Sequence, residues 1–343
     1  MHLLPEWTAQ DAIQLSWPHP NSAWKPWLAA AQQLFTSMCA HISQYQKVVI
    51  ACDTSLDIDE LNTQLAQHQV NMENIILKSI PANDIWARDH GPITISVDSH
   101  PKILDFSFNA WGQKYAFDKD NLINSRLKEQ GVYATNIEPV DLVLEGGSIE
   151  YDGHGTLMTT ANCLLNPNRN PGLNQQQIQQ QLTDLFGLQQ LIWLQHGHLE
   201  GDDTDAHIDT LARFGPDNAL VYVQCLDPQD VHFEALQKME MELQQARDAQ
   251  GQPYRLFPVP MVPAIHSADG DRLPATYANF LMTNRQVLVP IYGQSTDQQA
   301  LDIVQQAFPN LQVVGLNCRV LIEQYGSLHC VTMQLPKGTV AGN

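Results

Sequence analysis

The chain has 343 residues, and its 43% hydrophobic content is ample for a large core. Its 18 basic and 37 acidic residues give a formal net charge of −19, which repels nucleic acid and anionic membranes and attracts small cations. The N-terminus has no secretory-signal pattern, and no run approaches the roughly 18 apolar residues that span a bilayer. We therefore expect a cytoplasmic protein without nucleic-acid or membrane partners.

Strand-like and helix-like runs alternate along the chain. In the first half, the patterns predict helices near 27–45, 58–65 and 118–130, and strands over 47–52, 75–80, 93–97 and 103–108. In the second half, they predict helices near 173–187 and 228–250, and strands within 141–151, 156–160, 191–194, 207–214, 219–224, 280–293 and 328–332. A strand, strand, helix, strand order thus recurs about five times without a long linker, which favours one domain over residues 1–343. A doubly wound sheet is the main alternative.

The cysteines are spread through the chain without a CxxC pair or a short regular spacing. This pattern argues against a disulfide framework or a structural zinc site, so we expect reduced thiols. The six cysteines are Cys39, Cys52, Cys163, Cys225, Cys318 and Cys330.

The segment from Asp84 to Pro92 follows a predicted strand and concentrates two acids, an aromatic residue and a Gly-Pro turn. Loops at strand ends often carry functional residues, and here Trp86 and Asp89 are the candidates. A turn in which Arg88 forms a salt bridge with Asp84 or Asp89 is the structural alternative.

Glu145 interrupts an apolar run at the predicted end of a strand and precedes two glycines. A buried carboxylate needs a partner or a cationic ligand, because burying it without a counter-charge costs several kcal/mol. The glycines allow a second backbone or a substrate to approach closely. The alternative is an ordinary turn with Glu145 in solvent.

Histidines and acids are densest between His196 and Asp209. If this segment is a strand, His207 and Asp209 point to the same face, which suits a base beside an acid. His196 and His198 are expected in a surface loop. The alternative is a zinc site that combines them with His207.

Cys330 follows a glycine turn at Gly326 and lies in a short apolar segment predicted to be a strand. A cysteine in such a segment is usually buried and inert, but a thiol that acts with a base is a nucleophile. Neighbouring side chains of a strand point to opposite faces, so His329 is predicted to face away from the thiol.

Four motifs in this order resemble the agmatine deiminase and bacterial peptidylarginine deiminase-like family of guanidino-group-modifying enzymes. They are WARDHGP at 86–92, EGGSIEYDG at 145–153, TDAHID at 204–209 and GSLHCVT at 326–332. The opening PEW…LSWPHP is also similar to the start of agmatine deiminases. The resemblance implies an α/β pentein fold, a propeller of five ββαβ units with the active site in its central channel.

The resemblance also implies roles for individual residues. Cys330 matches the nucleophile, His207 the general acid and base, and Glu145 the acid beside the reacting nitrogen. Asp89 and Asp209 match the carboxylates that hold the guanidinium, and Trp86 matches an aromatic residue near the substrate chain. Paired carboxylates suit a planar, always charged guanidinium, because each can form bidentate charge-assisted hydrogen bonds with it.

The expected reaction converts agmatine to N-carbamoylputrescine and ammonia through a Cys330 amidino-thioether, without a metal or organic cofactor. A deiminase for peptidyl-arginine or another guanidino compound, a non-catalytic guanidino or polyamine binder, and a zinc hydrolase are the alternatives. The sequence leaves open whether the chain forms a homo-oligomer.

Two positions depart from the agmatine deiminase pattern. That family usually has a further glycine where this chain has Tyr325, and Gln-Gln where this chain has Met333 and Gln334. We expect these positions near the mouth of the site, where they would affect recognition of the substrate's tail.

Overall fold

The computed structural model describes residues 1–342, so Asn343, the end of the predicted single domain, lies outside the described residues. The described chain divides into two compact units, which are described separately. Unit 1 contains Met1–Trp7, Gly147–Met282 and Gln286–His329, and unit 2 contains Thr8–Gly146, Thr283–Arg285 and Cys330–Asn343. Two unit boundaries thus fall inside predicted site motifs, after Gly146 and after His329. The single domain over 1–343 stays a prediction.

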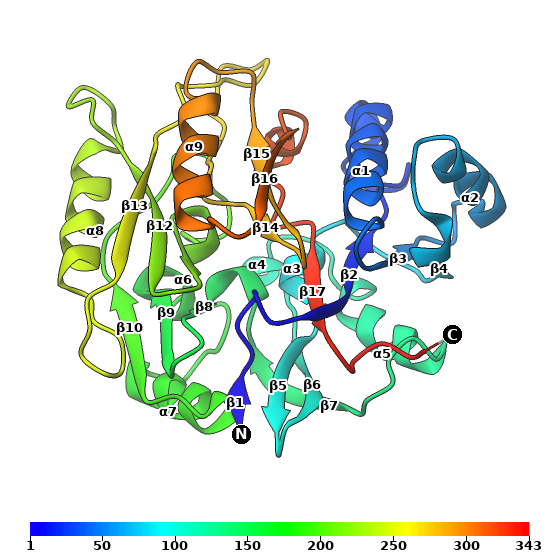
Figure 1. The fold of residues 1–343 in the computed structure, drawn as a ribbon, viewed down its shortest axis with the longest axis horizontal. Helices are drawn as coiled ribbons and strands as arrows, with labels where there is room; N and C mark the ends of the chain where they lie inside the picture. The colour runs from blue at the N-terminus through cyan, green and yellow to red at the C-terminus, as the bar shows by residue number, and fades with distance from the viewer. Residues whose placement is uncertain (343) are drawn as a thin grey trace. The chain divides into compact units, whose positions relative to one another are not determined.

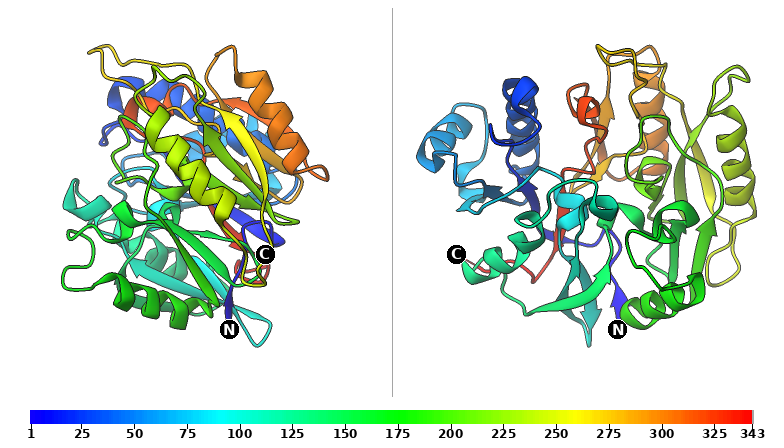
Figure 2. Two further views of the ribbon diagram at one scale, coloured as in Figure 1. Left: turned by 90° about the vertical axis from the view of Figure 1, so that its left-hand side faces the viewer. Right: turned by 180° about the vertical axis from the view of Figure 1, so that it is seen from behind.

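The first strand group of unit 2 combines the two ends of the sequence. Its order is β17 (Met333–Pro336), β2 (Gln10–Ser16), β3 (Lys47–Cys52) and β4 (Ile75–Ser79). Strand β17 is antiparallel to β2, whereas the β2–β3 and β3–β4 pairs are parallel. Helices α1 (Leu28–Ile42) and α2 (Ile58–Ala66) make the two parallel crossovers, as Figure 2 shows from behind.

The second group of unit 2 consists of an antiparallel pair followed by a parallel pair. Strand β5 (Ile93–Val97) pairs with β6 (His100–Ser107) antiparallel, and β6 pairs with β7 (Ile137–Val143) parallel. The β6–β7 connection contains α4 (Ala110–Gln113), η3 (Asp120–Leu122) and α5 (Ile123–Glu129). The remaining short helices of unit 2 are η1 (Lys25–Trp27), η2 (Met72–Asn74) and α3 (Ala87–His90).

One hydrophobic core joins the two strand groups of unit 2. It takes Val49 from β3, Leu335 from β17, Ile103 from β6 and Leu127 from α5, all fully buried. Each such side chain stabilises the fold by about 1.5 to 3 kcal/mol relative to solvent exposure. The C-terminal strand is therefore part of the core of this unit.

Unit 1 repeats the antiparallel-then-parallel pattern three times. Each group has two antiparallel strands, a helix and a third, parallel strand. The strands are β8 (Glu150–Tyr151), β9 (Thr156–Thr160), β10 (Gln190–Leu194), β11 (Ala212–Gly215), β12 (Ala219–Gln224), β13 (Arg255–Pro260), β14 (Leu281–Met282), β15 (Gln286–Ile291) and β16 (Gln312–Asn317). Their crossovers contain α6 (Ala161–Leu164) with α7 (Gln175–Phe186), then α8 (Phe233–Gln245), then α9 (Asp297–Ala307).

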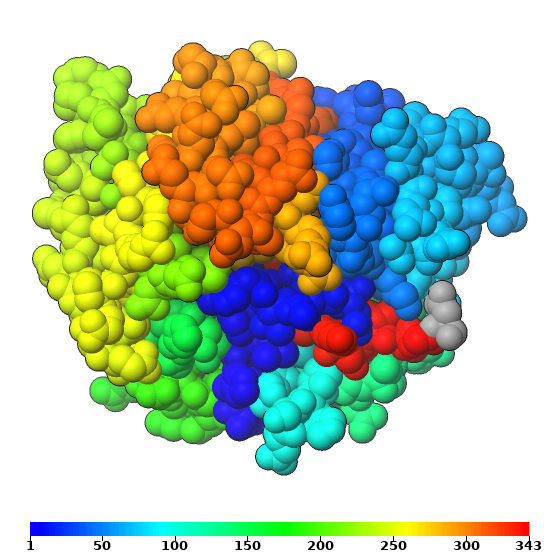
Figure 3. All heavy atoms as spheres, in the orientation of Figure 1, coloured from blue at the N-terminus to red at the C-terminus, as the bar shows by residue number. Residues whose placement is uncertain are grey.

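Helix α9 packs on β13 and β16, and α8 packs on β12 (Figure 1). These helices are amphipathic: α9 buries Ala300, Val304 and Ala307, and its other side lies on the outer surface of unit 1 (orange in Figure 3). The short elements of unit 1 are β1 (His2–Leu3), η4 (Gly146–Ser148, across the boundary), η5 (Ile208–Thr210) and η6 (Leu321–Gln324).

The strand, strand, helix, strand order is confirmed in four groups, whereas the first follows the order β2, α1, β3, α2, β4 along the chain. The mixed α/β class is correct. The predicted strands 207–214 and 328–332 are wrong in part: η5 occupies the first half of the former, and a turn occupies 328–331. Helix α8 is also shorter than the predicted 228–250. Within residues 1–342, no helix combines the length and apolarity needed to cross a membrane.

A partly buried hydrogen-bond chain fixes the segment that leads into α3. The Asp84 carboxylate oxygen Oδ1 accepts hydrogen bonds from Trp24 Nε1 and from the backbone N of Ile85, each at 2.8 Å. The backbone N of Asp84 donates to Asp120 Oδ2 at 3.1 Å. Burial raises the pKa of Asp84 to about 6 and the pKa of Asp120 to about 8.

Helix α7 begins with a capping box, whose contribution to stability can be measured. Asn174 accepts a hydrogen bond from the backbone N of Gln177, whose side chain accepts one from the backbone N of Asn174. Asn174→Ala should lower the free energy of unfolding in urea by about 1 kcal/mol, while Asn174→Asp keeps the acceptor and should stay close to wild type. Equal stability of all three proteins would contradict this role.

Titration of Asp84 should make the free energy of unfolding depend on pH. Its folded pKa of about 6 lies above the reference value of 3.8, so the folded state binds this proton more tightly. The resulting stabilisation is full below pH 3.8 and is lost as the pH rises through about 6. Asp84→Asn keeps an oxygen for Trp24 but cannot titrate.

The measurement is urea denaturation of wild type and Asp84→Asn across this pH range. The stability of wild type relative to the variant should fall as the pH rises. Asp118→Asn, at a neighbouring position in the same unit, serves as the control. A stability difference between wild type and Asp84→Asn that does not change with pH would contradict the buried, proton-binding state of Asp84.

Candidate active site

In unit 2, helix α3 carries Asp89 at 3% exposure. The Asp89 oxygen Oδ2 accepts a hydrogen bond from Trp111 Nε1 at 2.9 Å. Trp111 itself has a left-handed backbone with φ 55°, and Asn109 Oδ1 supports this turn by accepting from Gly112 N at 2.9 Å. An unusual backbone conformation thus aims an indole N–H at the predicted guanidinium-binding acid.

Trp86 precedes α3 and lies between two other indoles. Its ring centroid is 5.8 Å from that of Trp24 and 6.4 Å from that of Trp111. Tyr115 packs edge-on against the far side of the cluster, at 5.9 Å from Trp111, and is 52% exposed. Trp86 is 6% exposed, so its ring orientation is set by neighbours rather than by solvent.

Arg88 connects α3 to the C-terminal strand. Its Nη1 lies 3.5 Å from Met333 Sδ, and its Nη2 donates to Gln334 Oε1. The salt bridge with Asp84 that the sequence left open is not formed, because Asp84 accepts from Trp24 instead. Met333 and Gln334 were expected near the mouth of the site, but they are 4% and 6% exposed and lie against Arg88.

Cys330 lies next to α3, and its backbone carbonyl accepts a hydrogen bond from Arg88 N at 3.1 Å. The residue belongs to a turn directly before β17, so the predicted strand over 328–332 is wrong. Leu328 and Val331 are fully buried in that turn, which explains why the segment looked like a strand in the sequence. The premise that adjacent side chains alternate between two faces therefore does not apply to His329 and Cys330.

Glu145 follows β7 and is fully buried, as predicted. The next residue, Gly146, lies so close to α3 that an added Cβ would be 2.4 Å from Arg88 O and 2.8 Å from Met333 Cε. Gly91 is equally restricted, with Ala87 O at 2.3 Å and Met333 Cγ at 2.8 Å from an added Cβ. The two glycines therefore let the Glu145 segment and α3 approach β17.

Four of the predicted residues thus gather around α3 in unit 2. They are Trp86, Asp89, Glu145 and Cys330, and they bring two buried carboxylates, an indole and a thiol into one region. The other two predicted residues, His207 and Asp209, belong to unit 1.

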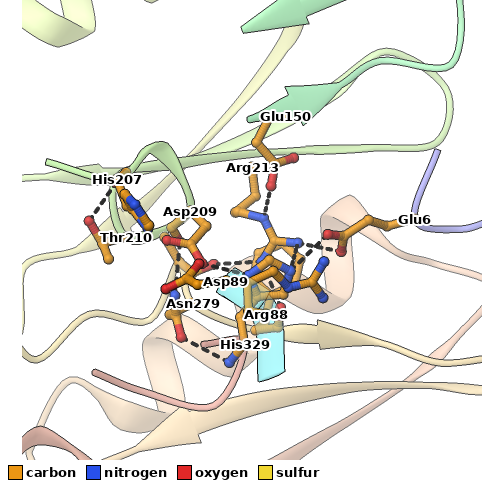
Figure 4. Close-up of polar contacts among 12 residues, drawn as sticks. Glu6, Arg88, Asp89, Glu150, His207, Asp209, Thr210, Arg213, Asn279 and His329 are labelled. Atoms are coloured by element: carbon orange, nitrogen blue, oxygen red, sulfur yellow. Dashed lines mark hydrogen bonds and ion pairs between the residues drawn. The ribbon is translucent and has the colours of Figure 1, made fainter. Parts of the chain in front are cut away.

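His207 lies at the start of η5, which is a tight turn and not the predicted strand. The argument that His207 and Asp209 share a strand face is therefore wrong, although both side chains are fully buried. The backbone N of His207 donates to Thr204 Oγ1 at 3.1 Å, and its carbonyl accepts from Thr210 Oγ1 at 2.8 Å (Figure 4).

The loop before His207 is held in a strained conformation. Asp205 and Ala206 both have φ 65°, in the left-handed region. Arg169 holds this loop by an ion pair with Asp205 Oδ2 at 2.7 Å and a hydrogen bond to Thr204 O at 2.9 Å. Consecutive left-handed residues need such support, because each costs free energy.

Asp209 has a neighbour that the sequence did not predict. Its Oδ2 lies 2.7 Å from His329 Nδ1, and both side chains are fully buried (Figure 4). Asn279 links the same two residues through the backbone: its Oδ1 accepts from His329 N at 2.8 Å, and its Nδ2 donates to Asp209 O at 3.3 Å.

Further charges surround His329 in unit 1. Arg213 is fully buried and forms ion pairs with Glu150 and with Glu6, the latter at 2.6 Å. His329 Nε2 lies 2.8 Å from Glu6 Oε1 and 3.0 Å from Arg213 Nη2. Burial alone would lower the pKa of Arg213, but the carboxylates of Glu150 and Glu6 outweigh it and raise that pKa.

The histidines of the zinc alternative do not form a common site. His196 is exposed and pairs with Glu242, and His198 packs against His232 with ring centroids 6.1 Å apart. Among the described residues, neither belongs to a group of three potential metal ligands.

All six cysteines are buried, and none forms a disulfide in the described structure. Burial raises the pKa of the Cys52 thiol to about 12 and also raises the pKa values of Cys39, Cys225 and Cys318. These four thiols are disfavoured as thiolates, which leaves them a packing role.

Sequence reasoning assigned no role in the site to five residues: Glu6, Trp111, Glu150, Arg213 and His329. Arg213 carried the clearest signal, since an arginine within an apolar strand needs buried acidic partners. The identity of those partners could not be read from the sequence, because Glu6 lies more than two hundred residues away.

A family model described as Porphyromonas-type peptidyl-arginine deiminase matches residues 2–336. A Yersinia pseudotuberculosis protein named "Putative agmatine deiminase" is 34% identical, covering 96% of this chain and 94% of that protein.

Two crystal structures are similar over nearly their full length. One, from Porphyromonas gingivalis and titled "Putative Arginine Deiminase", has 44% identity and a TM-score of 0.93 and covers 99% of both chains. The other is a substrate-bound cysteine-to-serine variant of the C. jejuni agmatine deiminase, with 38% identity and a TM-score of 0.90, covering 98% of this chain and 96% of that chain. On these matches, the chain belongs to the Porphyromonas-type peptidyl-arginine deiminase family and shares the α/β fold of its agmatine deiminase relatives.

Proposed function

We propose that this protein hydrolyses the guanidino group of agmatine to give N-carbamoylputrescine and ammonia. The observation that carries the proposal is the region around α3, where Cys330 lies beside α3 with the buried carboxylates of Asp89 and Glu145. The names of the Yersinia and C. jejuni relatives support agmatine as the substrate.

The proposed reaction begins with attack of the Cys330 thiolate on the guanidinium carbon, which forms a carbon–sulfur bond. His207 gives a proton to the departing amino group, ammonia leaves, and an amidino-thioether remains. His207 then accepts a proton from water as the water oxygen attacks the same carbon. The carbon–sulfur bond breaks, and the net reaction is guanidinium plus water to ureido product plus ammonium.

The acids would hold the substrate during these steps. Asp89 and Asp209 would accept hydrogen bonds from the guanidinium, and Glu145 would lie beside the reacting nitrogen. Each charge-assisted bond contributes about 1.5 to 3 kcal/mol, and fixing an acid beforehand lowers the entropy cost of binding. The hydrogen bond from Trp111 to Asp89 supports this, since it already orients one carboxylate.

The descriptions of the family and of one relative support a second substrate class. The family model names peptidyl-arginine, and the Porphyromonas relative is titled an arginine deiminase. Both substrates contain the same guanidino group and differ from agmatine only in what lies at the far end of the chain.

The remaining expectations rest on sequence and resemblance. Each of the five strand groups contains an antiparallel pair followed by a parallel pair, with β4 added in the first group, and this supports a five-unit propeller, which we propose as the arrangement. The cytoplasmic location and the absence of a cofactor stay predictions, and whether the chain forms a homo-oligomer stays open.

Cys330→Ala should lower kcat by roughly a thousandfold or more, because no other group replaces a nucleophile. Ammonia release from agmatine provides the measurement, and acid quenching of wild type should leave an amidino adduct on the Cys330 peptide in mass spectrometry. Cys52→Ala, which removes a buried thiol of the same unit, should keep wild-type turnover. Normal turnover by Cys330→Ala would remove Cys330 from the mechanism.

Substrate identity follows from kcat/KM for agmatine, free arginine and a peptidyl-arginine. We expect agmatine to be preferred, because it carries two positive charges and no carboxylate and the protein has a net charge of −19. A higher kcat/KM for peptidyl-arginine would assign the second substrate class. Binding of agmatine without turnover of any of the three would identify a guanidino-binding protein instead.

A further inference from the structure

His329 is adjacent to the proposed nucleophile in sequence, and the strand prediction turned its side chain away from the Cys330 thiol. That strand is a turn in the structure. In unit 1 the His329 ring lies between Asp209 on one side and Glu6 with Arg213 on the other (Figure 4). The imidazole is fully buried, so its two nitrogens must be satisfied by these neighbours.

The contact at Nδ1 defines where one hydrogen lies. Asp209 Oδ2 is 2.7 Å from Nδ1, and an ionised carboxylate oxygen can only accept a hydrogen bond. Nδ1 therefore carries a hydrogen that it donates to Asp209, in the neutral Nδ1–H tautomer and in the imidazolium alike. At Nε2 the ring can accept from Arg213 or, when protonated, donate to Glu6.

The main chain fixes the same geometry. Asn279 accepts from the backbone N of His329 and donates to the backbone O of Asp209, so the two residues are joined both through their side chains and through Asn279. Arg213 is itself held by Glu150 and by the carbonyl of Phe280 at 2.7 Å, which gives the Nε2 side of the ring a rigid neighbour.

We propose that His329 is the positioning residue of Asp209: its Nδ1–H fixes the orientation of the carboxylate that receives the substrate guanidinium. This assignment rests on the proposed function, because that function identifies the ligand of Asp209 as a guanidinium. When a hydrogen bond already fixes one carboxylate oxygen, the other oxygen has a defined position for a planar cation. A carboxylate that rotates freely loses this freedom on binding, which costs entropy. His329 would act on affinity through Asp209 and would not exchange protons with the substrate.

Two substitutions separate this role from simple packing. An asparagine side chain places its amide nitrogen close to the position of Nδ1, whereas a glutamine places it close to Nε2. His329→Asn should therefore keep the hydrogen bond to Asp209, and His329→Gln should lose it. We expect KM for agmatine to rise about tenfold or more in His329→Gln and to stay within about threefold of wild type in His329→Asn. In both variants, kcat should change by a smaller factor than the factor by which KM rises in His329→Gln.

His232 offers a matched control in the same unit. It is also a buried histidine whose Nδ1 contacts an aspartate, Asp230, at 2.7 Å. His232→Asn and His232→Gln should have the same KM as each other, because this pair is not linked to Asp209. Equal KM values for His329→Asn and His329→Gln would overturn the positioning role.

A second measurement separates failure of this inference from failure of the proposed function. Urea unfolding of His329→Gln, Asp209→Asn and the double variant forms a double-mutant cycle that needs no substrate. A coupling of about tenfold in the unfolding equilibrium constant supports the His329–Asp209 bond. Additive effects would overturn it. If wild type turns over no guanidino compound while the coupling is found, the proposed function fails and the positioning of Asp209 stands.

Discussion

The pairing of β17 with β2 is the constraint on which unit 2 and its part of the site depend. It aligns Met333 with Gln14 and so carries the C-terminal residues to the side chain of Arg88. Once β17 is fixed, Gly91 and Gly146 must both approach the Met333 side chain, and no larger residue fits at either position. The thiol, α3 and the Glu145 segment are therefore positioned by one strand pair and two close contacts.

Unit 1 is distinguished by a cluster of charged side chains that contact one another in its interior. Arg213 pairs with Glu6 and Glu150, and His329 pairs with Asp209, so each acid of this cluster has a nitrogen partner within unit 1. Such a network is expensive to break, because removal of one member leaves another charge buried without compensation. The same rigidity suits a site that must hold a cation in a fixed orientation.

The sequence predicted most helices and strands, because the hydrophobic periodicity that identifies each of them lies within its own residues. Strand β5 matches its predicted bounds, and α7 differs by only a few residues, since its apolar stripe and its Asn174 cap lie within the helix sequence itself. The failures at 207–211 and 328–331 share one cause: buried turns are as apolar as strands, and their backbone is set by partners such as Thr204 and Asn279.

The candidate site was predictable only at the level of residue type and motif. The six predicted residues are all buried, but the side chains that orient them could not be predicted, because Trp111–Asp89 and His329–Asp209 are tertiary contacts. The prediction that His329 faces away from the Cys330 thiol stays untested, but its premise is wrong. It assumed strand geometry, and a turn removes the alternation on which that inference depended.

The β17–β2 pair also has a consequence for synthesis of the chain. Gln14 pairs with Met333, so 333 − 14 = 319 residues must be added before the partner of β2 exists. At translation rates of about 5 to 20 residues per second, β2 waits for roughly 15 to 65 s with one edge unpaired. An unpaired strand edge is a template for association with other chains. Nascent chains of this protein therefore expose this edge of β2 until β17 has been synthesised.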